Sequence, residues 1–218
     1  MDNVEQKYQN ALDYLYKFVD YSLTKQDRLA AAKFDLQRMV DLMHLLGDPQ
    51  NMYPIIHVAG TKGKGSTAAM IASVMQAAGY KTGLYTSPHL QDYCERIKID
   101  RVNISHEKMV DFVEQIKPAV AKIEGLTTFE LTTALGFKAF AEAGVEVAVF
   151  EVGLGGRLDA TNILSPLVSV ITSLSYDHMA VLGDTLAQIA TEKAGIIKAG
   201  RPVVLAPQED NARKVVEE

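Results

Sequence analysis

The sequence has 218 residues, enough for one α/β domain with a substantial core or for a domain with an appendage. Hydrophobic residues make up 48% and charged residues 22%, which excludes a disordered, collagen-like or coiled-coil chain. The formal net charge of -5, with Lys and Arg scattered, gives no footprint for nucleic acid, although a glycine-rich loop can still bind phosphate. The longest apolar stretches are strand-length, far below the roughly 20 residues that span a bilayer, so we expect no membrane partner.

The cysteine content and the N-terminus indicate the compartment. Cys94 is the only cysteine and cannot form an intrachain disulfide. The first residues are acidic and helical in pattern, without the basic-then-apolar organisation of a secretory signal. We therefore expect a cytoplasmic protein.

The first predicted elements are two helices. Residues 4–18 carry apolar side chains at helical spacing, and a polar patch at 22–28 follows. A second helix is predicted over 36–46, where Gly47-Asp48-Pro49 ends it.

From residue 55 onward, short apolar strands alternate with helices. Strands are predicted at 55–59, 80–86, 96–100, 146–150, 167–172 and 202–206, and helices at 66–78, 105–123, 128–143 and 185–197. This alternation predicts an α/β fold with a parallel, doubly wound sheet. Residues 211–218 read as the opening of another helix with nothing to pack beside, so we expect a fragment of a longer chain.

A glycine-rich segment, HVAGTKGKGST at 57–67, lies between a predicted strand and a predicted helix. Its glycines allow backbone N–H groups to approach phosphate oxygens, and the helix adds the positive end of its dipole. Lys64 adds a charge for the outer phosphates, and the hydroxyls of Ser66 and Thr67 suit a magnesium ion. The strict GxxxxGK[ST] spacing fails at Val58 and Gly65, which leaves a turn without a ligand as the alternative.

Three other polar residues are candidates for a site, two of them after predicted strands and one in a predicted helix. Glu151 immediately follows the apolar strand at 146–150, where an open α/β sheet binds ligands, and is either a magnesium ligand or a solvated acid. His178 follows the strand at 167–172 and, on position alone, is structural. Lys193 lies in a helix beside Glu192, for which a solvated face is the default interpretation.

Thr127 with Glu130 forms a helix-capping pattern.

Five segments together carry a resemblance to a known family. They are GTKGKGS at 60–66, YTSPHL at 85–90, FEVGLGGRLDATN at 150–162, DH at 177–178 and EKAGIIK at 192–198. In this order they resemble the folylpolyglutamate/dihydrofolate synthase branch of the Mur ligase superfamily, from about residue 30 to about residue 207. Members of that family are about twice as long as this chain.

The resemblance implies a fold and a reaction. It implies a P-loop-type, doubly wound, mostly parallel sheet in which residues 1–218 form the N-terminal ATP-binding domain, without the C-terminal glutamate-binding domain. The implied reaction ligates L-glutamate to a carboxylate of folate or dihydropteroate through an acyl phosphate. ATP and Mg²⁺ are the implied cofactors, and the full-length protein is expected to be a monomer.

The same resemblance assigns site residues. The ATP loop comprises Gly60, Thr61, Lys62, Gly63, Lys64, Gly65 and Ser66. The implied metal ligands are Ser87, Glu151 and His178, and the implied catalytic residues are Lys64, His178 and Lys193, the last as the lysine that is carbamylated in this family. The pteroate site is assigned to Thr127, Thr128, Phe129, Glu130, Leu158, Asp159 and Ala160, with Phe34, Asp35 and Leu36 as a weaker piece.

Two other functions remain open at this point. A different amide ligase of the same superfamily, such as a muramyl ligase, is disfavoured by TSPHL and GLGGRLDATN. A nucleotide-binding module without ligase activity would bind ATP but show no glutamate-dependent release of ADP. The residues also leave open whether the pteroate reaction, the polyglutamate reaction or both are native.

Overall fold

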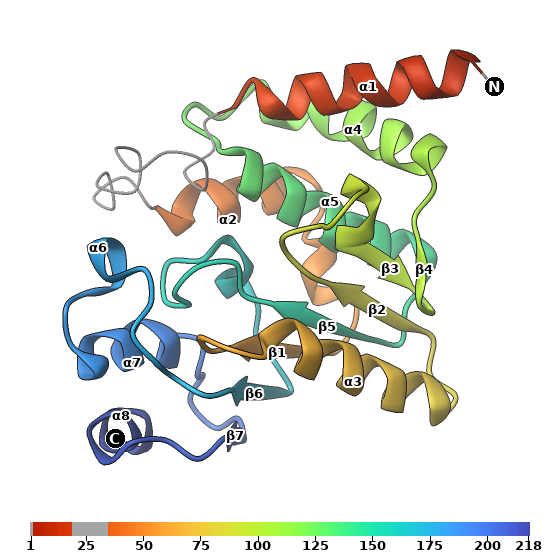
Figure 1. The fold of residues 1–218 in the computed structure, drawn as a ribbon. Coiled ribbons are helices and arrows are strands. Elements are labelled where there is room, and N and C mark those ends of the chain that lie inside the picture. The colour runs from red at the N-terminus through yellow and green to blue at the C-terminus, as the bar shows by residue number, and fades with distance from the viewer. Residues whose placement is uncertain (1, 19–34) are drawn as a thin grey trace.

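The computed structural model describes residues 2–18 and 35–218. Within them a seven-stranded sheet has the order β4-β3-β2-β5-β1-β6-β7 (Figure 1). The strands β2, β5, β1, β6 and β7 run parallel to one another, and β3 and β4 extend the β2 edge with antiparallel pairing. The predicted mostly parallel, doubly wound sheet is confirmed. The strands are β1 (Ile55–Ala59), β2 (Thr82–Tyr85), β3 (Ile97–Ile99), β4 (Val102–Asn103), β5 (Val147–Glu151), β6 (Val168–Ile171) and β7 (Val203–Leu205).

Helices cover both faces of this sheet (Figure 1). Within the described ranges, none combines the length and apolar composition needed to cross a bilayer. The α-helices are α1 (Asp2–Tyr16), α2 (Leu36–Leu45), α3 (Lys64–Ala77), α4 (His106–Val120), α5 (Thr128–Ala143), α6 (Met179–Leu182), α7 (Leu186–Ala194) and α8 (Asp210–Glu217). Short 3-10 helices are η2 (Pro49–Asn51), η3 (Tyr93–Arg96) and η4 (Ala160–Ile163).

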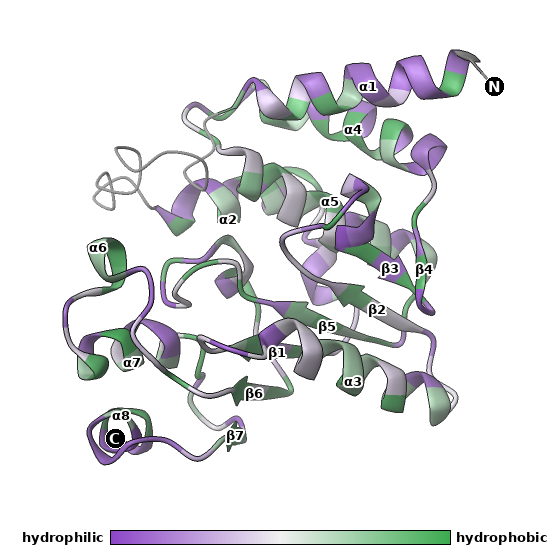
Figure 2. Ribbon diagram, in the orientation of Figure 1, coloured by the Kyte–Doolittle hydropathy of each residue, from purple (hydrophilic) through white to green (hydrophobic). Residues whose placement is uncertain are grey.

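The two faces of β5 pack into different clusters, because successive side chains of a strand point in opposite directions. Ala148 and Phe150 pack in the larger cluster with α1, α2, α4 and α5, whereas Val147 and Val149 pack against α3. All five residues of β5 are buried, and Figure 2 shows this strand mostly in the hydrophobic colours. A strand buried on both faces is typical of a parallel sheet between helical layers.

The last helix, α8, has a packing partner, contrary to the expectation for residues 211–218. Ala212 is fully buried, and Val215 and Val216 pack against a cluster that includes Leu186 and Ala190 of α7. The sequence pattern missed this contact because α7 is short and its apolar side chains are divided between α8 and the sheet.

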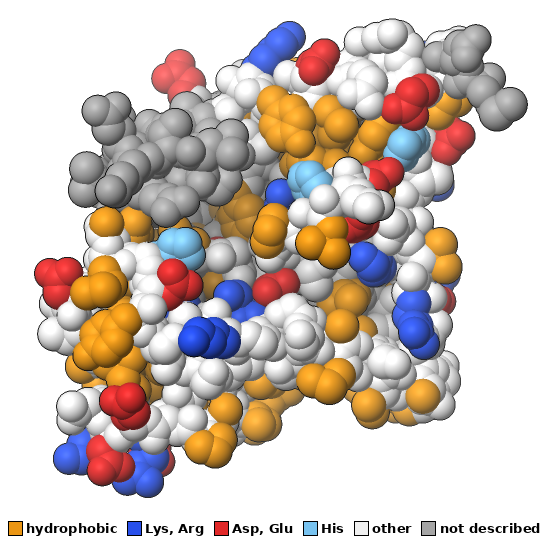
Figure 3. Space-filling model, in the orientation of Figure 1, with side chains coloured by type: hydrophobic (Ala, Val, Ile, Leu, Met, Phe, Trp, Pro, Cys, Tyr) orange, Lys and Arg blue, Asp and Glu red, His pale blue; other side chains and the backbone are white. Residues whose placement is uncertain are grey.

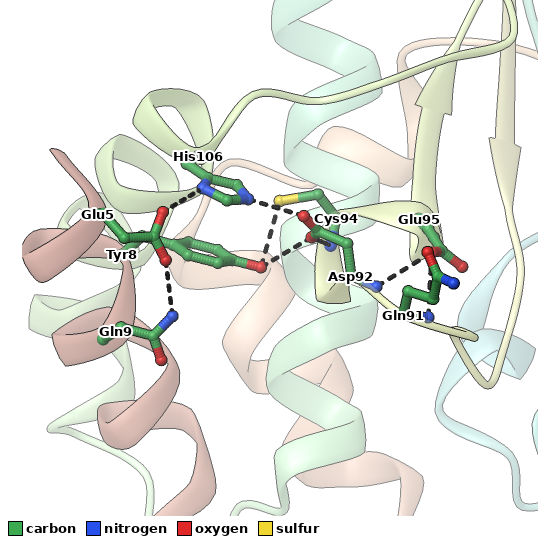
Figure 4. Close-up of polar contacts among 8 residues, drawn as sticks. All are labelled: Glu5, Tyr8, Gln9, Gln91, Asp92, Cys94, Glu95 and His106. Atoms are coloured by element: carbon green, nitrogen blue, oxygen red, sulfur yellow. Dashed lines mark hydrogen bonds and ion pairs between the residues drawn. The ribbon is translucent and has the colours of Figure 1, made fainter. Parts of the chain in front are cut away.

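The helix α1 lies outside the sheet layers and is attached through a polar cluster (Figure 4). The His106 ring stacks on Tyr8 with 3.7 Å between centroids. Its Nε2 lies 2.8 Å from Asp92 Oδ2, and its Nδ1 lies 2.9 Å from Glu5 Oε2. The Tyr8 hydroxyl donates to Asp92 Oδ1 at 2.9 Å. His106 therefore joins carboxylates from α1 and from the segment before η3, and we call these four residues the His106 cluster.

Candidate functional site

The polar segments predicted to bind ligands meet at one edge of the sheet. The strands β1, β5 and β6 are parallel neighbours, so their carboxyl ends share an edge. Gly60 follows β1, Glu151 ends β5, and the loop that contains His178 follows β6.

The glycine-rich loop is held in place by the loop that follows β6. The amide of Thr61 donates to Ser173 O at 3.0 Å, and the Thr61 hydroxyl donates to Ser175 O at 3.1 Å. Gly63 has φ of 78° at the start of α3, in the left-handed region that favours glycine. Gly60 has φ of 147°, and a Cβ there would collide with the Thr172 side chain. The arrangement of strand, bent loop and helix N-terminus suits phosphate.

The Glu151 side chain faces Gly65 at the start of α3 and is almost completely buried. Its Oε2 accepts a hydrogen bond from the Ser87 amide at 3.2 Å. Burial raises the pKa of Glu151, while the Ser87 amide and the positive charge of Lys64 oppose that rise. A Cβ on Gly65, where the strict motif has Ser or Thr, would lie 3.2 Å from Glu151 Oε2 and would crowd the carboxylate.

Ser87 and Glu151 thus come together from β2 and β5, and Ser87 and His178 line the same cavity. A buried carboxylate next to Ser87 and a phosphate-type loop fits Mg²⁺, which prefers oxygen ligands. His178 has φ of 48°, and its Nε2 lies 3.7 Å from Asp177 Oδ2. His178 therefore borders the site while its ring already faces a carboxylate.

Lys193 does not lie on a solvated helix face, so the default interpretation of its position is wrong. Its side chain is buried, and Nζ donates to Gly60 O at 2.8 Å. Burial, with the charge of Lys64, lowers the pKa of Lys193 to about 8. A larger neutral fraction makes the amine a better nucleophile, as carbamylation requires.

A cavity of about 490 Å³ adjoins Ser87. Figure 3 shows hydrophobic, acidic and histidine side chains gathered around a hollow near the middle of this face. The Thr127 amide donates to Glu130 Oε2 at 2.7 Å, so the predicted capping pattern is present. Asp35 and Leu36 line the cavity, while Phe34 lies outside the described residues. The cavity also includes all seven residues predicted for the pteroate site: Thr127, Thr128, Phe129, Glu130, Leu158, Asp159 and Ala160.

The buried Asp159 carboxylate organises the loop after Glu151. Its Oδ2 accepts from the amides of Gly153 at 3.0 Å and Leu154 at 2.9 Å. Its Oδ1 accepts from the Thr161 amide at 3.0 Å and the Thr161 hydroxyl at 2.5 Å. Burial raises the pKa of Asp159, and these donors oppose the rise.

Sequence reasoning missed two arginines that line the cavity, Arg96 and Arg157. Arg96 Nε donates to His89 Nδ1 at 2.9 Å, and its guanidinium lies 4.9 Å from the centroid of the Tyr93 ring. Arg157 pairs with Glu192 at 2.8 Å. The available signal for Arg96 was its position as the first residue of the predicted strand at 96–100, because an arginine at the end of a strand can bind an anionic ligand.

These features define an α/β domain with a phosphate-loop-type turn and an adjoining cavity. Residues 58–218 match the Mur ligase middle domain, and the chain belongs to that family.

Relatives of named activity support the predicted branch. The chain is 46% identical to the dihydrofolate synthase/folylpolyglutamate synthase of Bacillus subtilis, over 83% of this chain and 44% of that protein. It is 44% identical to the folylpolyglutamate synthase of Lacticaseibacillus casei, over 84% of this chain and 44% of that protein. The resemblance inferred from the motifs is confirmed, and the chain spans about half the length of these relatives.

Solved structures agree with this result. The apo form of L. casei FPGS has a TM-score of 0.88 and 41% identity, covering 96% of this chain and 50% of that one. An FPGS-AMPPCP-folate complex has a TM-score of 0.88 and 40% identity, with the same coverage.

Proposed function

We propose that the protein carrying this chain ligates L-glutamate to a carboxylate of folate or dihydropteroate, with hydrolysis of ATP to ADP and phosphate. The observation that carries the proposal is the contact between Ser87 and Glu151, which joins the phosphate loop to the 490 Å³ cavity. Relatives named as folylpolyglutamate or dihydrofolate synthases match most of the chain. The reaction is placed in the cytoplasm, in keeping with the single cysteine.

In this proposal the residues from Gly60 to Ser66 bind the phosphates of ATP. Backbone amides of the loop and the Lys64 ammonium face negative oxygens and position the γ-phosphorus near the cavity. Glu151, Ser87 and His178 would hold magnesium, which supplies positive charge to neutralise the phosphate oxygens.

The substrate carboxylate attacks the γ-phosphorus, and ADP leaves as the acyl phosphate forms. The amino group of glutamate then attacks the acyl carbon, phosphate leaves, and the ammonium proton passes to solvent. The protein contributes mainly positioning and charge neutralisation. Lys193, with its lowered pKa and its contact with Gly60, is proposed to be carbamylated and to act beside the metal.

The pteroate part of the substrate is proposed to occupy the cavity lined by residues 127–130 and 158–160. Residues 1–218 form the ATP-binding domain in this proposal. Glutamate binds to a C-terminal domain that corresponds to the part of the relatives that this chain does not match. The complete protein is proposed to act as a monomer.

Release of ADP tests this function. A version of the chain that is extended to the length of its relatives should release ADP only when ATP, glutamate and a folate or dihydropteroate are all present. ADP release with a UDP-muramyl substrate would identify another ligase of the superfamily. Binding of Mg-ATP without any glutamate-dependent release would leave only a nucleotide-binding module.

A further inference from the structure

A buried histidine on the phosphate-loop strand is connected to the wall of the substrate cavity. His57 lies in the middle of β1 and has no exposed surface. Its Nε2 lies 2.8 Å from Thr161 Oγ1, and the Thr161 hydroxyl reaches Asp159 Oδ1. Burial lowers the pKa of His57 to about 3, so the ring is neutral. None of the roles proposed above uses His57 or Thr161.

The direction of each hydrogen bond follows from the partners. The amides of Gly153, Leu154 and Thr161 can only donate, so the Asp159 oxygens accept from them. Burial raises the pKa of Asp159, but the three N–H donors oppose that rise and favour the ionised carboxylate, which also accepts a hydrogen bond from the Thr161 hydroxyl. The Thr161 oxygen is left to accept from His57 Nε2–H. The neutral ring then carries no proton on Nδ1, which has no partner among the described residues.

Four donors fill the acceptor sites of the Asp159 carboxylate, so this group acts as an anchor for the backbone around it. Gly153 and Leu154, held by Oδ2, form the cavity wall together with Phe129. A Cβ on Gly153 would collide with the Phe129 ring, so the loop lies directly on that side chain. A shift of the carboxylate would therefore move the wall.

We propose that His57 and Thr161 are positioning residues that orient the Asp159 carboxylate, so that it fixes the Gly153–Leu154 backbone against the cavity. The phosphate loop directly follows the strand that contains His57, so the connection fixes the cavity wall relative to that loop. The part of this inference that concerns substrate rests on the proposed function. The part that concerns the loop rests on the contacts alone.

The test compares Thr161→Val, which removes the hydroxyl at nearly constant volume, with Thr161→Ser, which keeps it. Amide hydrogen exchange of Gly153 and Leu154 is measured by NMR in the 218-residue chain without ligands. In the Thr161→Val variant we expect these two amides to exchange about tenfold faster, because hydrogen bonds to a charged group are strong and local opening sets the rate. Val149 in β5 should change little, and the Thr161→Ser variant should match the unmodified chain.

Unchanged exchange of Gly153 and Leu154 in the Thr161→Val variant would overturn the inference. Equal acceleration in β5 would also overturn it, because it would indicate a general loss of structure. If the Thr161→Val variant does not fold, the same exchange measurement is made on the His57→Phe variant. This change removes only the hydrogen bond between His57 and Thr161 and keeps a ring in the core. We expect it to accelerate the same two amides, and wild-type rates would exclude His57 from the connection.

Calorimetry with folate provides the second readout. The Thr161→Val variant should bind folate about tenfold more weakly while its affinity for Mg-ATP is unchanged, and the Thr161→Ser variant should bind both normally. Normal folate binding by the Thr161→Val variant would overturn the link to the substrate. Absence of folate binding in the unmodified chain would instead contradict the proposed function, and the exchange data would still decide the role of Thr161.

Discussion

At the scale of single residues, Lys64 and Gly65 make different contributions to the same loop. Lys64 begins α3 and is part of the proposed phosphate site, not of the core. We expect Lys64→Ala to weaken binding of Mg-ATP at least about tenfold, because it removes a positive charge that faces the phosphates, and to leave the unfolding temperature nearly unchanged. Calorimetry and thermal unfolding measure the two effects. Lys122→Ala, an exposed change at the end of α4, is the control, and equal affinity in both variants would contradict the loop assignment.

Gly65 departs from the strict phosphate-loop motif at a position where a side chain would contact Glu151. A methyl group at this position would lie 3.2 Å from Glu151 Oε2. We expect Gly65→Ala to reduce the magnesium-dependent part of nucleotide affinity about tenfold, because the methyl group displaces the carboxylate. Helical propensity favours alanine by about 1 kcal/mol, so the variant should not be less stable. Titration with ATP at high and low magnesium measures the effect, with the exposed Ala69→Ser as control, and a normal magnesium dependence would exclude this role of Glu151.

At the scale of elements, the His106 cluster makes the attachment of α1 depend on pH. Partial burial opposes protonation of His106, but hydrogen bonds to Asp92 and Glu5 prevail and raise its pKa. The contribution of His106 to the free energy of unfolding is therefore complete below its ordinary pKa of about 6.5. It is lost as the pH rises through the raised pKa of the folded state. Hydrogen bonds lower the pKa of Asp92 to about 2 against the effect of burial, so its contribution is lost only in strong acid.

We expect His106→Gln to destabilise the chain by about 1 kcal/mol or less at pH 5.5, and by a smaller amount at pH 8.5. Thermal unfolding across this pH range, beside the exposed His44→Gln, measures the difference. A loss that grows with pH would show that His106 is not bound as the cation.

The elements that sequence patterns predicted well are those whose own residues determine them. The strand at 146–150 and the helix capped by Thr127 and Glu130 are present, because an apolar run and a capping pair are local signals. The predicted strand at 96–100 is present as β3 (Ile97–Ile99), although Arg96 ends η3, and neither η3 nor the two-residue β4 was predicted. The burial of Lys193 could not be predicted from helical spacing. It depends on Gly60, a residue 133 positions away in the sequence.

At the scale of the whole molecule, β7 forms one edge of the sheet and exposes apolar side chains. Val203 is 38% and Val204 is 57% exposed. An apolar edge strand is a template for pairing with another chain, so we expect the 218-residue chain to self-associate at high concentration. Sedimentation should show a shift toward monomer in the Val204→Lys variant, and no concentration dependence in the unmodified chain would contradict the expectation.

Ligation itself places the strongest demand on the complete protein. The chain spans about half of its relatives, yet it contains the phosphate loop, Glu151 and the cavity. The reaction requires ATP, a pteroate carboxylate and glutamate in near-attack geometry, and such positioning can supply about 7–11 kcal/mol of the barrier. We therefore expect the 218-residue chain to bind Mg-ATP but to form little or no folyl-glutamate.

Product formation from labelled glutamate, measured beside ATP binding on the same preparation, checks this expectation. The matched control is the chain extended to the length of its relatives. Rapid folyl-glutamate formation by the monomeric 218-residue chain would mean that the glutamate site lies within these residues. Arg96 and Arg157, the two guanidinium groups on the cavity wall, would then be the first candidates for binding the glutamate carboxylates, because arginine binds carboxylates through paired hydrogen bonds.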